Sequence, residues 1–233
     1  MIVAHATDIG CVRTTNEDSL LCIEPHIYAV ADGMGGHAAG EVASRMMIDT
    51  AKAALEHENP DYCTEDKLRS IVLDANQAIL KASAERPGCN GMGTTVSLFY
   101  VHYGYATWAH VGDSRIYLLR DGQIHQLTSD HSLVNELLQK QQITSQEAEH
   151  YPHKNVLTRA VGVSPALQVD TGYCDIREKD KFLLCSDGLT NMVSEEDIRS
   201  ICFSQEKDKT GKLIQAAVKG GGKDNVTCIL IEI

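Results

Sequence analysis

The hydrophobic residues in the first third of the chain are spaced first as in strands and then as in helices. Apolar positions alternate with polar ones, or follow one another, in three short segments: Ile2–Thr7, Ser19–Ile23 and Ile27–Ala31. From His37 to about His57 the apolar positions recur with the helical period. A second helical segment follows, and its apolar residues between Leu68 and Leu80 lie on one side. A proline and two glycines in Arg86–Gly91 end that segment. The pattern predicts three strands followed by two helices.

The rest of the chain is predicted to be mostly strands, with a second pair of helices near its end. The predicted strands are Thr94–His102, Ala106–Val111, Arg115–Leu119, Val169–Cys174, Lys181–Ser186 and Asn225–Ile233. Turns at Tyr103-Gly104 and Asp121-Gly122 indicate antiparallel hairpins. The predicted helices are Ser194–Phe203 and Thr210–Lys219. The polar, weakly helical segment Asp130–Gly162 is expected to run over the surface. Strand runs that alternate with helix pairs favour an α+β sandwich in one domain, residues 1–233.

Composition narrows the class of protein. The 233 residues are 43% hydrophobic and carry a formal charge of −11, which disfavours nonspecific binding to nucleic acid. The N-terminus lacks the basic and apolar regions of a signal peptide, and no apolar run approaches the ~20 residues that span a bilayer. The eight cysteines form no Cys-x-x-Cys pair and lie mostly in apolar runs. We therefore expect buried free thiols, a cytoplasmic protein, and no membrane or nucleic-acid partner.

The segment Gly33–Ala38 matches the G-x-G-x-x-A form of a dinucleotide-binding fingerprint. It also follows an apolar run and precedes a predicted helix, as that fingerprint does. Its context argues against that function. The helix leads to a second helix rather than to the parallel strand of a βαβ unit. Asp32, directly before the first glycine, would also repel a pyrophosphate. The glycines are therefore interpreted as giving access to Asp32.

Three further aspartates lie at the ends of apolar runs, at Asp113, Asp187 and Asp224. Taken singly, an Asp-Gly pair is only a turn former, and Asp121-Gly122 is interpreted in that way. As a set, Asp32 and the other three carboxylates predict one shared cleft. Hard oxygen ligands without cysteine favour Mg²⁺ or Mn²⁺ over zinc or copper.

Six segments carry a resemblance to a known family. They are Asp8–Asp18, Val30–His37, Gly91–Thr95, Val111–Arg115, Cys185–Leu189 and Lys223–Thr227. In order and spacing they resemble the motifs of the metal-dependent type 2C protein phosphatases, and most of all the compact bacterial branch. The resemblance covers essentially the whole chain. It implies a central antiparallel β-sandwich flanked by helix pairs, with a metal cleft at one end of the sheets.

The resemblance also implies roles for individual residues. Asp32 would bridge two Mg²⁺ or Mn²⁺ ions, Gly33 would offer its carbonyl, and Asp187 and Asp224 would complete the binuclear site. Asp113 would bind a third ion and share Asp187 with it. Glu17 and Asp18 would orient metal-bound waters, and Arg13 would bind the substrate phosphate. The segment 144–162 corresponds to the flap, where relatives vary most.

One position departs from the eukaryotic pattern. There a histidine follows the Asp-Gly pair and is proposed to protonate the leaving group, whereas this chain has Met34. His37, three residues on, is the candidate for that role through water. The alternative, that His37 only hydrogen-bonds at the start of the helix, stays open.

The resulting hypothesis is a metal-dependent serine/threonine protein phosphatase, expected to be a monomer. Its substrates would be phosphorylated proteins, and it would oppose a serine/threonine kinase. Two alternatives stay open: a phosphatase-fold binding module without catalysis, and a phosphatase for small metabolites. The binding module is disfavoured because the five ligand positions Asp32, Gly33, Asp113, Asp187 and Asp224 are all intact.

Overall fold

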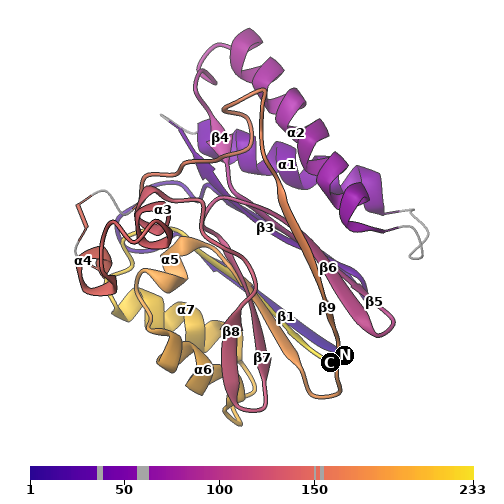
Figure 1. Ribbon diagram of the computed structural model, residues 1–233, viewed down its shortest axis with the longest axis vertical. Coiled ribbons are helices and arrows are strands. Elements are labelled where there is room, and N and C mark those ends of the chain that lie inside the picture. The colour runs from indigo at the N-terminus through magenta and orange to yellow at the C-terminus, as the bar shows by residue number, and fades with distance from the viewer. Residues whose placement is uncertain (36–38, 57–62, 150, 153–154) are drawn as a thin grey trace.

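Two antiparallel sheets form the centre of the computed structural model, which describes residues 1–35, 39–56, 63–149, 151–152 and 155–233 (Figure 1). The first sheet has the order β1 (Ile2–Asp8), β11 (Val226–Glu232), β10 (Lys181–Cys185), β7 (Arg115–Arg120) and β8 (Gln123–Gln126). The second has the order β2 (Asp18–Ile23), β3 (Ile27–Met34), β5 (Val96–His102), β6 (Tyr105–Val111) and β9 (Asp170–Asp175), with β4 (Gly93–Thr94) paired to β3. The sheets pack through a buried apolar layer that includes Tyr28, Phe99, Phe182 and Ile229.

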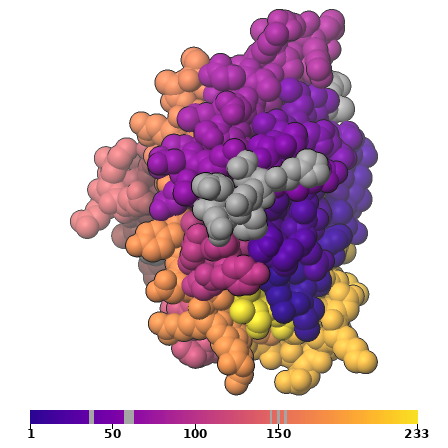
Figure 2. All heavy atoms as spheres, turned by 90° about the vertical axis from the view of Figure 1, so that its right-hand side faces the viewer, coloured from indigo at the N-terminus to yellow at the C-terminus, as the bar shows by residue number. Residues whose placement is uncertain are grey.

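A pair of helices covers the outer face of each sheet. Helices α1 (Ala39–Leu55) and α2 (Glu65–Glu85) pack on the second sheet through a core that includes Met47, Ile71 and Leu98. Helices α6 (Glu195–Phe203) and α7 (Lys209–Lys219) pack on the first sheet. The space-filling view shows the purple residues of the first pair at the top and the yellow C-terminal residues at the bottom (Figure 2). The predicted α+β sandwich flanked by helix pairs is confirmed.

The hairpins and helices follow the predicted pattern closely, because they are encoded by local periodicity and turn residues. The turns at Tyr103-Gly104 and Asp121-Gly122 join β5 to β6 and β7 to β8. Three short helices lie outside the four layers: α3 (Leu133–Gln139), α4 (Ser145–Glu149) and α5 (Asp187–Thr190). In the described part of the chain, no helix is long and apolar enough to cross a membrane.

Two predictions about strand bounds near Asp32 were wrong. β3 does not end before Asp32 but continues to Met34, because Gly33 and Met34 pair with β4. The predicted strand from Thr94 is interrupted at Thr95, whose amide donates to the Asp32 carbonyl and whose hydroxyl accepts from the Asp32 amide.

The segment Asp130–Gly162 does not lie wholly on the surface. His131 and Ser132 at its start, and Ala160 and Val161 near its end, are buried. The backbone bridge between Thr94 and Val161 explains this, because it ties the end of the segment to the second sheet. The cysteines are free, but Cys11 is exposed, so the expectation of buried thiols does not hold throughout.

Candidate active site

Seven of the nine predicted site residues line one cleft of ≈ 310 Å³. They are Arg13, Glu17, Asp32, Gly33, Asp113, Asp187 and Asp224. They come from the loop between β1 and β2, from β3, from the turn between β6 and β7, from the start of α5, and from the loop before β11. An eighth, Asp18, pairs directly with Asp32 across β2 and β3. The ninth, His37, lies outside the described residues, and so its two roles stay open.

Hydrogen bonds between distant segments hold the loops of the cleft in place. The Asn225 side-chain amide donates to the carbonyls of Ile9 and Thr15, and its oxygen accepts from the Glu17 amide at 2.8 Å. Ser186, at the N-terminus of α5, donates to the Asp18 carboxylate at 2.8 Å and accepts from the Thr227 amide. These bonds join the β1–β2 loop, α5 and β11 into one wall.

Gly33 is required by close packing rather than by a turn. A Cβ atom at this position would lie 2.1 Å from the Gly40 carbonyl oxygen and 2.7 Å from that of Glu17. Any side chain would therefore push the N-terminal end of α1 away from β3. Both Asp32 and Gly33 line the cleft.

The carboxylates of the cleft are crowded and poorly compensated. Burial, together with the charges of neighbouring aspartates, raises the pKa of Asp18 to about 7 and that of Asp113 to about 8. Burial and the same kind of repulsion raise the pKa values of Asp32 and Asp187. Among the described residues that line the cleft, Arg13 is the only cation. Its Nη2 donates to Asp224 Oδ2 at 2.8 Å.

This donor set fits hard divalent cations. Asp18 Oδ1 and Asp187 Oδ1 are buried without a hydrogen-bond partner, a costly arrangement unless a ligand satisfies them. In the part of the chain that the structure describes, no three carboxylate, imidazole or thiolate groups are arranged to enclose an ion by themselves. Mg²⁺ commonly keeps several waters and takes only one or two carboxylates, so an open cleft of this kind suits it.

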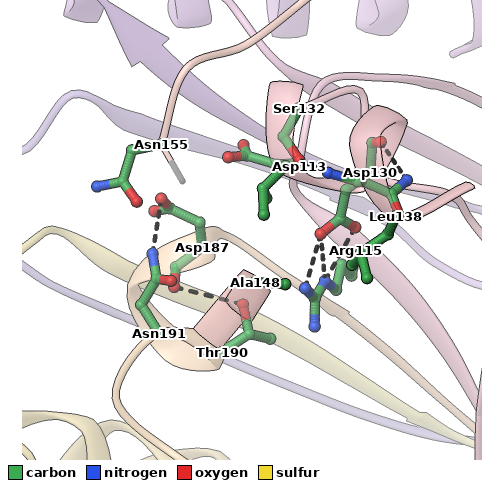
Figure 3. Close-up of a pocket in the computed structure, with 12 residues that line it drawn as sticks. Asp113, Arg115, Asp130, Ser132, Leu138, Ala148, Asn155, Asp187, Thr190 and Asn191 are labelled. Atoms are coloured by element: carbon green, nitrogen blue, oxygen red, sulfur yellow. Dashed lines mark hydrogen bonds and ion pairs between the residues drawn. The ribbon is translucent and has the colours of Figure 1, made fainter. Parts of the chain in front are cut away.

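A second pocket of ≈ 180 Å³ adjoins the cleft and shares Asp113, Asp187 and Asn155 with it (Figure 3). Asn191, from the end of α5, donates to Asp187 Oδ2 at 2.9 Å. On the opposite wall, Arg115 forms a two-pronged ion pair with Asp130. Because its guanidinium is occupied by Asp130, we interpret Arg115 as a structural residue of this wall.

The sequence pattern missed Asn155 and Thr95 as residues of the cleft and Asn191 as a residue of the adjoining pocket. Asn191 lies four residues after Asp187, a helical spacing that would have placed the two side chains together had α5 been foreseen. Asn155 gives no such signal, because it lies in an irregular part of the 144–162 segment. Met34 lines the cleft as expected from its position, and its thioether carries no proton to donate.

Comparisons with known proteins give one consistent result. A family model described as protein phosphatase 2C matches residues 12–213. The protein phosphatase PhpP of Streptococcus pneumoniae is 39% identical over 241 residues, covering 100% of this chain and 98% of that protein.

Solved structures agree. The Mycobacterium tuberculosis serine/threonine phosphatase PstP/Ppp superposes with a TM-score of 0.94 at 37% identity, covering 100% of this chain and 98% of the other. The PstP catalytic domain in complex with two manganese ions superposes with a TM-score of 0.90 at 36% identity, covering 98% of this chain and 96% of the other.

Proposed function

The chain belongs to the protein phosphatase 2C family of serine/threonine protein phosphatases, and we propose that its acidic cleft is the metal-dependent catalytic centre. The family depends on metal, and one relative has been solved with two manganese ions. The observation that carries the proposal is the convergence of Asp32, Asp113, Asp187 and Asp224 in one cleft that holds a single arginine.

Each residue of the cleft has a role in this proposal. Asp32, the Gly33 carbonyl, Asp187 and Asp224 hold the central pair of Mg²⁺ or Mn²⁺ ions, and Asp113 shares Asp187 to hold a third. When bound, such ions supply Lewis-acid activation of water and screen the charge of the phosphate. Glu17 and Asp18 orient water by accepting hydrogen bonds.

Arg13 binds the phosphate of the substrate. Its guanidinium offers a planar fork that matches two phosphate oxygens. The Arg13 side chain is 49% exposed and forms an ion pair with Asp224, which is itself 31% exposed, so the fork can turn toward a ligand without breaking a buried network. The Arg13 guanidinium would then bind the phosphate either together with Asp224 or in place of it.

The substrates are phosphoserine and phosphothreonine side chains of proteins, and the partner is a serine/threonine kinase that phosphorylates the same proteins. Segment 144–162 is the flap that selects among them. Asn155 and Leu157 of this segment line the cleft, which supports the assignment. The monomeric state and the cytoplasmic location stay predictions.

The test is phosphatase activity under controlled metal. Protein stripped with EDTA should lose hydrolysis of an aryl phosphate and regain it with Mn²⁺ or Mg²⁺. Phosphothreonine peptides should then be hydrolysed under the same conditions. Full activity in excess chelator, or a trapped phosphoenzyme, would contradict the proposal.

A further inference from the structure

The peptide groups of Gly112, the residue before Asp113, are held by two buried histidines. The Gly112 amide donates to His131 Nδ1 at 3.1 Å. Its carbonyl accepts from the His131 amide at 2.7 Å and from His110 Nε2 at 3.1 Å. His110 is fully buried and His131 is 5% exposed. Both hydrogen-bonding groups of one glycine are thus satisfied by side chains or backbone of these two residues.

These hydrogen bonds hold Gly112 in an unusual backbone conformation. Gly112 has φ of +109°, and a Cβ atom there would lie 2.5 Å from Thr95 Cγ2. Few residues other than glycine adopt this backbone conformation. Gly112 follows the end of β6, so regular strand pairing does not hold its amide and carbonyl. The direction in which Asp113 leaves β6 therefore depends on the contacts made by the Gly112 amide and carbonyl.

The other edge of the His131 ring faces Asp170, the first residue of β9, and Arg159 of the segment 144–162. Because Nδ1 accepts from Gly112, Nε2 carries the ring proton and donates to Asp170 Oδ2 at 3.1 Å. Arg159 lies beside this pair and donates to Asp170 Oδ1 at 2.7 Å. Burial lowers the pKa of His131, which keeps the ring neutral and able to accept at Nδ1.

The main chain around His131 is joined to the same segment. The His131 carbonyl accepts from the Thr158 amide at 2.8 Å, and the Leu133 amide donates to the Val156 carbonyl at 2.8 Å. Ser132 and Leu157 form a backbone bridge. His131 and the two residues after it thus join the peptide before Asp113 to residues 156–159.

We propose that His131 is a positioning residue, which sets the direction of Asp113 by accepting a hydrogen bond from the Gly112 amide at Nδ1. The inference rests on the proposed function of Asp113 as a metal ligand. Outer residues that orient metal ligands affect metal affinity or activity by about 10- to 100-fold.

Two amide substitutions separate the two edges of the ring. In His131→Asn the side-chain oxygen occupies the place of Nδ1 and can still accept from Gly112, while contact with Asp170 is lost. In His131→Gln the amide reaches the place of Nε2 and keeps Asp170, while the acceptor for Gly112 is lost. His131→Ala removes both. The exposed His125 on β8, changed to asparagine, is the matched control.

The first measurement is hydrogen exchange of the Gly112 amide in EDTA-treated protein, which needs neither metal nor activity. Gln and Ala at position 131 should speed this exchange by about tenfold or more, and Asn should stay within about threefold of wild type. Amides of β5 and β6 remote from Gly112 serve as the internal check that the fold is kept. Equal exchange in the Asn and Gln variants would overturn the proposal.

The second measurement is the Mn²⁺ concentration that half-activates aryl phosphate hydrolysis. It should rise about 10- to 100-fold in the Gln and Ala variants, with KM for the ester within about twofold, and stay near wild type in His131→Asn and His125→Asn. An unchanged Mn²⁺ requirement in all three variants would overturn the proposal. A wild-type protein without metal-dependent activity would instead contradict the proposed function and leave the exchange result to decide the role of His131.

Discussion

The two ends of the β-sandwich differ in whether their carboxylates have cationic partners. At the end that carries the chain termini, Asp180 is 1% exposed and is gripped by Arg120, with Nη2–Oδ2 and Nε–Oδ1 distances of 2.6 and 2.8 Å (Figure 1). Glu232 binds Lys181 and Lys209, each at 2.7 Å. Burial alone would raise the pKa values of Asp180 and Glu232, but these partners lower both below their ordinary values.

Of the aspartates that line the cleft, only Asp224 has such a partner among the described residues, because it binds Arg13. Asp18 and Asp187 each keep a buried oxygen without a hydrogen bond. Burial with mutual repulsion raises the pKa values of these two residues and of Asp32 and Asp113. A paired carboxylate stabilises the fold, whereas a crowded, unpaired one costs stability and is retained for a ligand. The difference separates structural from functional aspartates more reliably than burial does.

The largest expected effect comes from Asp32→Asn. The side chain keeps its size but loses the charge that would hold divalent ions in the proposed centre, and such ions supply several kcal/mol of transition-state stabilisation. Phosphatase activity should fall by about 10³-fold or more, measured as kcat/KM with an aryl phosphate and Mn²⁺. In EDTA the variant should unfold at a higher urea concentration than wild type, because one repelling charge is gone.

The matched control is Asp121→Asn, which changes another Asp-Gly pair, at the exposed turn between β7 and β8. It should leave both activity and stability unchanged. If Asp32→Asn keeps its activity, or loses stability in EDTA as a paired aspartate would, the distinction between the two ends fails.

Asp180→Asn should show the reverse behaviour. Arg120, 19% exposed, would lose its carboxylate partner, at a cost of about 2–3 kcal/mol in the free energy of unfolding. Activity below the unfolding temperature should stay near wild type, because the substitution lies at the far end of the sheets. Urea unfolding and the aryl phosphate assay measure the two quantities. A large loss of activity in the folded variant would contradict the assignment.

The elements that carry the cleft were predictable from the sequence wherever local rules determine them. Alternation gave the strands, and turn residues such as those at Asp121-Gly122 gave the hairpins. The ordered motifs indicated which aspartates meet. Seven of the nine predicted site residues, four of them aspartates, do share one cleft, and their roles stay predictions.

Long-range contacts account for what the sequence did not reveal. β3 runs past Asp32 because β4, sixty residues later in the chain, pairs with it, and periodicity around Asp32 contains no trace of that partner. His131 sits in a polar segment and was expected at the surface. It is buried because Gly112 and Asp170, from two other segments, surround its ring. Neither partner can be inferred from spacing alone.

Arg13→Ala tests the one cation that the cleft contains among its described lining residues. A charge-assisted hydrogen bond to phosphate is worth about 1.5–3 kcal/mol, so kcat/KM should fall by about 10- to 100-fold, with a raised KM, for every ester tested. Arg13→Lys should recover only part of this, since an ammonium group cannot form the planar fork. An unchanged KM in Arg13→Ala would remove Arg13 as the phosphate-binding group.

The smallest expected effect is the acid dependence of the far-end pair. The pKa of Asp180 in the folded state lies below its ordinary value of 3.8, so the folded state binds its proton more weakly than the unfolded state. The stability contributed by this ionised group is therefore fully present above about pH 5 and is lost as the pH falls through 3.8 toward the lower folded value. One proton of difference changes stability by at most about 1.4 kcal/mol per pH unit.

Asp180→Asn has no group to protonate, so the gap in unfolding free energy between wild type and variant should be widest at pH 7 and narrow between pH 4 and 3, as followed by urea unfolding in EDTA. Glu232→Gln should show the same narrowing from a slightly higher pH, because the ordinary pKa of that residue is 4.5. A gap that stays constant down to pH 3 would show that Arg120 and Asp180 stabilise the far end by packing and not by charge.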